Sequence, residues 1–118
     1  MLTLPPSTRV FIAAKPTDMR KSFDSLAALV RDFLGDDPLS GHLFVFRNKS
    51  GDRLKILWWD RDGLAIWYKR LEEGTFRFPS AGDGARLEMT AADLQLVLQG
   101  IDPAKVKRSK RYQRPPVA

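Results

Sequence analysis

Cysteine is absent from this chain of 118 residues, and His42 is its only histidine. Without cysteine the protein can form no disulfide, no thiolate metal site and no thiol nucleophile. A single histidine leaves no conventional histidine-based zinc site and no Ser-His-Asp triad to assemble. We therefore expect a protein that is not an enzyme and that carries no cofactor.

Long apolar runs are also missing, since no stretch approaches the roughly 20 residues that a membrane-spanning helix needs. Residues 1–6 carry no basic region followed by a long apolar stretch, so the sequence predicts no secretory signal. Hydrophobic residues make up 43% of the chain and charged residues 29%. We expect one small packed domain in the cytoplasm, or associated with the nucleoid, and no membrane partner.

Acidic residues are missing from the C-terminal end. The chain has 20 basic and 14 acidic residues, but residues 104–118 hold six basic residues and no acidic one, so residues 1–103 are balanced. We divide the chain into one domain over residues 1–103 and a mobile basic arm over residues 104–118. A cationic arm favours contact with DNA, and the alternative is a solvated tail that only aids solubility. The basic residues of the arm are Lys105, Lys107, Arg108, Lys110, Arg111 and Arg114.

Hydrophobic periodicity and turn residues predict an α+β fold. Apolar residues spaced by three and four before Gly35 predict a helix of about four turns, and Thr90 is placed to cap a short helix that ends near Gly100. Hairpin-length turns separate the strands in the middle of the chain, which favours antiparallel neighbours. We expect a mainly antiparallel β-meander covered by one long and one short helix, with a mobile basic C-terminal tail. The expected strands are residues 10–14, 43–47, 53–59, 64–71, 75–78 and 86–89.

The expected hairpin over residues 53–71 contains a candidate phosphate site. If Gly63 is left-handed and closes the turn, the numbers of paired residues sum to about 124, which places Lys55 opposite Lys69. Like charges directly across a ladder repel, and a phosphate between them would relieve the repulsion. Trp59 and Trp67 would share this face and stack on bases or sugars. The alternative is that both tryptophans pack under a helix while the lysine stems reach outward.

Arg20 and Lys21 form a second candidate site at the start of the long helix. If the helix begins at Thr17, these cations oppose its dipole. Three explanations stay open: a later start at Ser22, a bound phosphate, or a salt bridge to an aspartate of the 60–62 turn. The candidate nucleic-acid-binding residues outside the arm are Arg20, Lys21, Lys55, Trp59, Trp67, Lys69 and Arg70.

Three aspartates raise the possibility of a metal-dependent nuclease. Asp60 and Asp62 lie two positions apart at a turn, and Asp18 precedes the long helix. Turn-forming and capping roles explain all three without a metal. We therefore expect no metal site, and a metal-dependent nuclease is the least favoured function.

The order and spacing of several short motifs resemble one protein family over about residues 8–101. The chain resembles the TnpB accessory protein of the IS-sixty-six family of insertion sequences, which is unrelated to the RNA-guided nuclease that shares its name. The motifs are residues 16–22 (PTDMRKS), 44–48 (FVFRN), 55–63 (KILWWDRDG), 68–74 (YKRLEEG) and 98–100 (LQG).

The resemblance implies a small bacterial helper that is encoded beside a separate, larger transposase and is needed for movement of the element. It supplies no catalytic residues that carry over to this chain. The expected function is a non-catalytic accessory protein of transposition that binds DNA, the transposase, or both. The alternative is a protein–protein interaction module that docks a partner through a Trp and Phe surface and makes no direct DNA contact.

Overall fold

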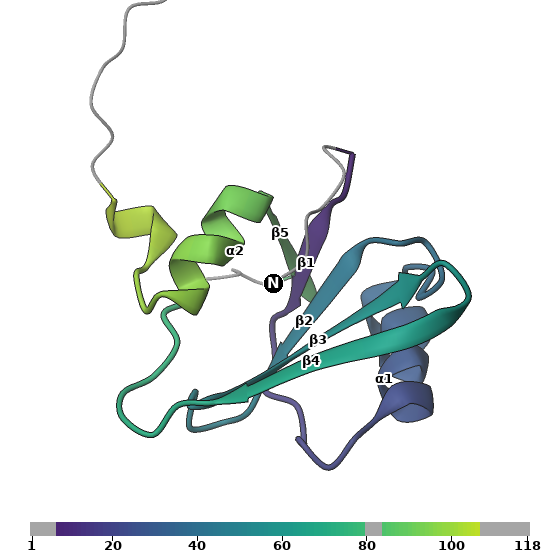
Figure 1. The fold of residues 1–118 in the computed structure, drawn as a ribbon, viewed down its shortest axis with the longest axis horizontal. Helices are drawn as coiled ribbons and strands as arrows, with labels where there is room; N and C mark the ends of the chain where they lie inside the picture. The colour runs from purple at the N-terminus through teal and green to yellow at the C-terminus, as the bar shows by residue number, and fades with distance from the viewer. Residues whose placement is uncertain (1–6, 80–83, 107–118) are drawn as a thin grey trace, which may run out of the picture.

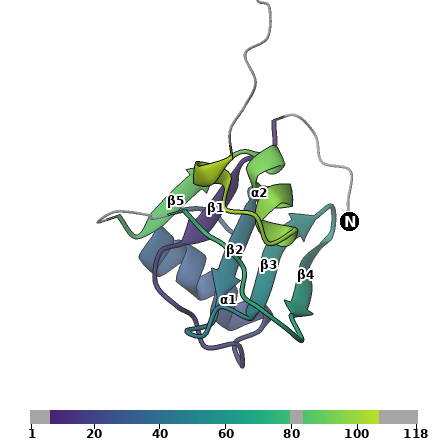
Figure 2. The ribbon, with the colours of Figure 1, turned by 90° about the vertical axis from the view of Figure 1, so that its left-hand side faces the viewer.

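A five-stranded mixed β-sheet lies at the centre of the fold, and the two α-helices cover its opposite faces (Figures 1 and 2). The computed structural model describes residues 7–79 and 84–106. The strand order across the sheet is β4-β3-β2-β1-β5. The strands are β1 (Val10–Ala13), β2 (Leu43–Arg47), β3 (Arg53–Asp60), β4 (Gly63–Arg70) and β5 (Arg86–Met89).

The predicted antiparallel meander is wrong as a description of the whole sheet. Only β2, β3 and β4 form a meander, whereas β1 pairs parallel with β2 and antiparallel with β5. The reason lies in the connection between β1 and β2, which crosses over through a helix, and such a crossover returns the chain parallel to the first strand. The expected strand at residues 75–78 is an irregular segment.

The predicted long helix is also wrong, because the chain forms two short α-helices, α1 (Phe23–Leu29) and α2 (Ala91–Leu98). A five-residue π-helical turn, Val30–Leu34, follows α1 and ends at Gly35, whose φ is +66°. The apolar spacing correctly placed Leu26, Val30 and Leu34 against the sheet, but Phe23 and Phe33 of the same spacing are exposed. Spacing also does not distinguish α from π hydrogen bonding. Among the described residues no helix has the length and hydrophobicity to cross a membrane.

Two hydrophobic cores result, one on each face of the sheet. The central strands β1 and β2 contribute alternate residues to both cores, which explains why they are continuous apolar runs in the sequence. Each face of the sheet is therefore covered by a helix. The core under α1 contains Phe11, Leu26, Val30, Phe44, Phe46 and Leu57, and the core under α2 contains Val10, Ile12, Leu43, Val45, Leu54, Ile56, Leu94 and Val97.

The turn between β3 and β4 corrects the predicted register by one residue. Arg61 takes the left-handed conformation, with φ of +59°, and Gly63 is not among the residues with positive φ. The loop therefore contains two residues, Asp60 pairs with Gly63, and the numbers of paired residues sum to 123. Neighbouring residues of a strand point to opposite faces of the sheet. A shift of one residue in register therefore gives each residue of β3 a different partner on β4 from the one predicted.

Candidate nucleic-acid interface

The observed register separates the side chains that were predicted to form one phosphate site. Lys55 pairs with Tyr68 rather than with Lys69, and Lys69 lies on the α2 face while Lys55 lies on the α1 face. Trp59 and Trp67 lie on opposite faces for the same reason. Trp67 is half-buried and packs against the core under α2, as the alternative interpretation expected of it, but Lys55 is buried and does not reach outward as the same interpretation expected. The two-lysine phosphate site and the shared tryptophan platform are therefore not formed.

The same register creates a different like-charge pair, because Arg53 lies directly opposite Arg70 on the α1 face. Arg53 turns its guanidinium toward Tyr68, whose hydroxyl oxygen lies 3.4 Å from Nη1. Arg70 bonds Glu72 at 3.0 Å, and this hydrogen bond raises the pKa of Arg70. These four residues line an open hollow of about 450 Å³.

Lys55 is the one charged residue that is buried in the described part of the chain, with 8% of its surface exposed. Its Nζ donates a hydrogen bond to the carbonyl oxygen of Lys21 at 2.7 Å and lies 4.7 Å from the centre of the Tyr68 ring. A carbonyl dipole and the face of an aromatic ring attract a cation, but neither carries the full negative charge of a carboxylate. Lys55 thus holds the segment before α1 against the hairpin and leaves a positive charge at their junction.

The segment before α1 removes one premise of the sequence interpretation. The helix begins at Phe23 with Ser22 as its N-cap, so Arg20 and Lys21 lie before the first helical turn, which is the later start that the sequence left open. Arg20 forms an ion pair with Asp18 at 2.7 Å rather than with an aspartate of the β3–β4 turn. The hydrogen bonds from Arg20 lower the pKa of Asp18 to about 2.

Arg53 also lines a second hollow of about 440 Å³, beside Asp18 and Lys49. The two hollows therefore meet at Arg53. Among the described residues, an ion pair within 4 Å is recorded for Arg70 but for none of the other cations around these hollows. We call the following set the basic rim: Lys21, Lys49, Arg53, Lys55 and Arg70.

Three carboxylates lie close to the basic rim, and each already has a partner. Asp18 bonds Arg20, and Glu72 bonds Arg70. Asp52 accepts hydrogen bonds from the Asn48 amide and the Ser50 hydroxyl, which lower the pKa of Asp52. Asp52 keeps its negative charge, because its two donors are neutral, but the five cations of the rim outnumber Asp52 and Glu72, so an excess of positive charge remains.

Sequence reasoning missed Arg53, Lys49 and Tyr68 as members of this site. The signal that could have identified Arg53 was a two-residue turn at Arg61 and Asp62. Such a turn pairs Asp60 with Gly63, and the resulting register places Arg53 opposite Arg70. The remaining predicted residues do not join the rim. Lys69 and Trp67 lie on the α2 face, and Lys105 is exposed in a 3-10 turn that contacts α2. Five further arm residues lie outside the described residues: Lys107, Arg108, Lys110, Arg111 and Arg114.

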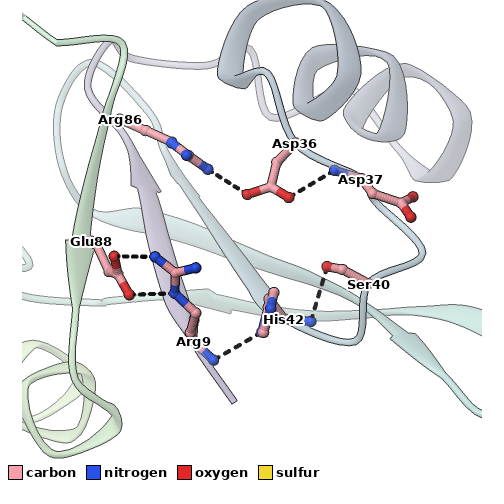
Figure 3. Close-up of polar contacts among 7 residues, drawn as sticks. All are labelled: Arg9, Asp36, Asp37, Ser40, His42, Arg86 and Glu88. Atoms are coloured by element: carbon pink, nitrogen blue, oxygen red, sulfur yellow. Dashed lines mark hydrogen bonds and ion pairs between the residues drawn. The ribbon is translucent and has the colours of Figure 1, made fainter. Parts of the chain in front are cut away.

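A second group of charged residues lies at the other edge of the sheet, and here each charge of the two ion pairs is matched (Figure 3). Arg9 forms two hydrogen bonds with Glu88, at 2.6 and 2.7 Å, and Arg86 pairs with Asp36. The guanidinium carbons of both arginines lie within about 5 Å of the Phe11 ring centre, at 5.1 and 4.3 Å. This group joins β1, β5 and the segment after the π-helical turn, so its role is to fasten the β5 edge.

The ion pair between Arg9 and Glu88 predicts an acid-dependent loss of stability. The hydrogen bond from Arg9 lowers the pKa of Glu88 below its ordinary value of 4.5. A lowered pKa in the folded state stabilises the protein above pH 4.5, and this stabilisation is lost as the pH falls through the folded-state value. We expect E88Q to have a lower melting temperature than the wild type at pH 7, and the difference should shrink below pH 4.5.

Thermal melting of both proteins between pH 7 and pH 3 checks this expectation. E73Q is the matched control, because Glu73 is exposed and lies outside the recorded ion pairs of the described chain. A difference between wild type and E88Q that stays constant down to pH 3 would contradict the assignment of the ion pair.

Comparison with known proteins identifies the family. The family model described as IS66 Orf2 like protein, TnpB_IS66, matches residues 8–108. The chain belongs to this family. The family assignment made from the sequence motifs is thereby confirmed. As a member of the IS66 Orf2-like family, the protein is a transposition-associated accessory protein.

Two relatives of this chain come from Sinorhizobium fredii (strain NBRC 101917 / NGR234). Uncharacterized protein y4hO is 46% identical over 102 residues, which cover 86% of this chain and 88% of the relative. Uncharacterized protein y4jC is 42% identical over 107 residues, which cover 91% of this chain and 90% of the relative. No solved structure matches the chain. The similarity thus extends over nearly the whole length of both relatives.

Proposed function

We propose that this accessory protein supports transposition by binding the phosphate backbone of duplex DNA through the basic rim. The observation that carries the proposal is the ammonium group of Lys55, which bonds the Lys21 carbonyl oxygen, forms none of the ion pairs of the described residues, and belongs to the same sheet face as the opposed pair Arg53 and Arg70. Phosphate oxygens supply the full negative charge that this group of cations lacks. Lysine and arginine contacts of this kind supply most of the affinity of non-specific DNA binding.

The chemistry of the rim supports backbone contact rather than reading of base sequence. Its members Lys49, Arg53 and Arg70 line two open hollows at the end of the hairpin where β3 begins and β4 ends. Base readout in the major groove needs an element such as an exposed helix that enters the groove. The helices α1 and α2 instead pack on the sheet. The rim therefore fits a role in positioning DNA, and the basic arm adds positive charge to the same chain.

Salt dependence of DNA binding tests the proposal. The affinity of the wild type for duplex DNA should fall steeply with salt, and each lost phosphate contact should reduce the slope of log affinity against log salt by about 0.9. A variant that carries K21Q and K49Q should show a reduced slope and an unchanged melting temperature. Deletion of residues 104–118 measures the separate contribution of the arm. If both altered proteins bind DNA with the same salt slope as the wild type, the result would contradict the proposal.

A second candidate function is docking of the transposase, and the π-helical turn favours it. The side chain of Phe33 is 70% exposed beside a mainly apolar hollow of about 310 Å³ that Leu29, Leu34 and Phe46 also line. An exposed aromatic residue next to such a hollow is typical of an anchor site for a partner protein. Co-purification with the transposase of the same element tests it. Loss of the transposase from F33A, with DNA binding retained, supports this second function.

A further inference from the structure

β4 forms an open edge of the sheet, and it differs from the edge formed by β5. β4 has eight residues without proline, whereas β5 has four and is fastened by ion pairs from Arg9 and Arg86. In the described part of the chain no further strand lies beyond β4 (Figure 2). A long edge strand with unpaired backbone groups is a ready template for pairing with another strand.

Asp62 and Arg70 place opposite charges at the two ends of β4. Asp60 is the last residue of β3, Arg61 stands between the two aspartates, and Glu72 and Glu73 follow Lys69 and Arg70. No ion pair is recorded for Asp60, Asp62 or Lys69 within residues 7–79 and 84–106, and Arg70 pairs only with the exposed Glu72. Such an exposed pair contributes little, so Arg70 can exchange partners at small cost.

This charge distribution specifies the direction in which a second copy of the strand can pair. Two β4 strands side by side in parallel place aspartates next to aspartates and arginines next to arginines. Two antiparallel strands can place Asp62 of each beside Arg70 of the other. Opposite charges across a strand pair are favourable and like charges are unfavourable, so the strand is self-complementary only in the antiparallel direction.

We propose that β4 pairs antiparallel with β4 of a second copy of this chain, which joins two five-stranded sheets into one of ten strands. A two-fold axis through Ile66 places Asp62 opposite Arg70 of the second copy and Leu64 opposite its Tyr68. Leu64 and Ile66 are half-buried and already pack against the core under α1. Pairing in this register continues that core across the interface and places both α1 helices on the same side of the sheet.

A cysteine crosslink tests the register directly, because the chain has no cysteine of its own. In I66C the two sulfurs come within disulfide distance only if the axis passes through this residue, since opposite residues have Cα atoms about 4.5–5.5 Å apart. We expect I66C to oxidise to a covalent dimer. Q95C, in an exposed position of α2, is the matched control and should form no covalent dimer under the same oxidation. Equal crosslinking of both variants would overturn the proposal.

Charge exchange tests the ion pairs by sedimentation. D62R and R70D each place like charges opposite one another, so each should weaken the dimer by tenfold or more. The double variant D62R/R70D restores two opposite-charge pairs and should recover the dimer. The proposal that a second copy occupies this edge would be overturned if the wild type stays monomeric. It would also be overturned if the wild type gains mass only when the transposase is added. These readouts need no DNA, so the outcome is separate from that of the proposed DNA binding.

Discussion

R53E should weaken the binding of duplex DNA by about tenfold or more, while its melting temperature stays equal to that of the wild type or rises. Arg53 lies where the two hollows of the basic rim meet, so a carboxylate there repels phosphate in both of them. In the fold the same change replaces a repulsion by an attraction, because Arg53 lies directly opposite Arg70. Opposite effects on binding and on stability are typical of a residue that is kept for function.

K69E is the matched control for R53E. It makes the same change of charge on the same hairpin, but Lys69 lies on the α2 face and is exposed. Fluorescence anisotropy with a labelled duplex at fixed salt should show a clearly smaller loss of affinity for K69E than for R53E. Equal losses would mean that net charge alone governs binding, and the basic rim would then have no special role.

F44A should lower the free energy of unfolding by about 3–5 kcal/mol, because truncation of a buried phenylalanine removes contacts and leaves a cavity. Phe44 is fully buried in the central strand β2 and stacks on Phe11 with ring centres 5.8 Å apart. Small domains have a total stability of about 5–15 kcal/mol, so this loss should leave little folded protein at moderate denaturant concentration. Chemical denaturation followed by tryptophan fluorescence measures it.

F33A provides the comparison for F44A on the same face of the sheet. The Phe33 side chain is mostly exposed, and surface substitutions of this kind usually change stability by less than about 0.5 kcal/mol. A loss for F33A as large as that for F44A would contradict the assignment of these two residues to surface and core.

Local signals in the sequence predicted local structure well. Thr90 caps α2 by accepting a hydrogen bond from the Asp93 backbone, and Gly35 ends the helical segment in a left-handed conformation, as expected. The strand at Leu43–Arg47 has the predicted bounds. Caps, glycine stops and turns depend on neighbouring residues, which a sequence displays directly.

Pairings between distant segments could not be read in the same way. The sequence shows that residues 10–14 and 86–89 form strands, but nothing local to either shows that β1 and β5 are neighbours. The candidate site failed for a related reason. One residue of difference in the turn at Arg61 separates Lys55 from Lys69 and brings Arg53 opposite Arg70 instead. Charge composition identified the class of residues, and the register decided which of them meet.

The pairing of β1 with β5 has a consequence for how the chain folds during synthesis. The ion pair between Arg9 and Glu88 joins residues 79 positions apart, and Val10 pairs with Met89 in the same ladder. At about 5–20 residues per second, a ribosome needs roughly 4–16 s to make the intervening chain. During that interval the four buried residues of β1 lack their neighbour on one side, and the core under α2 lacks its helix. Nascent chains that stop before residue 89 therefore expose apolar surface and are expected to be substrates for chaperones and proteases.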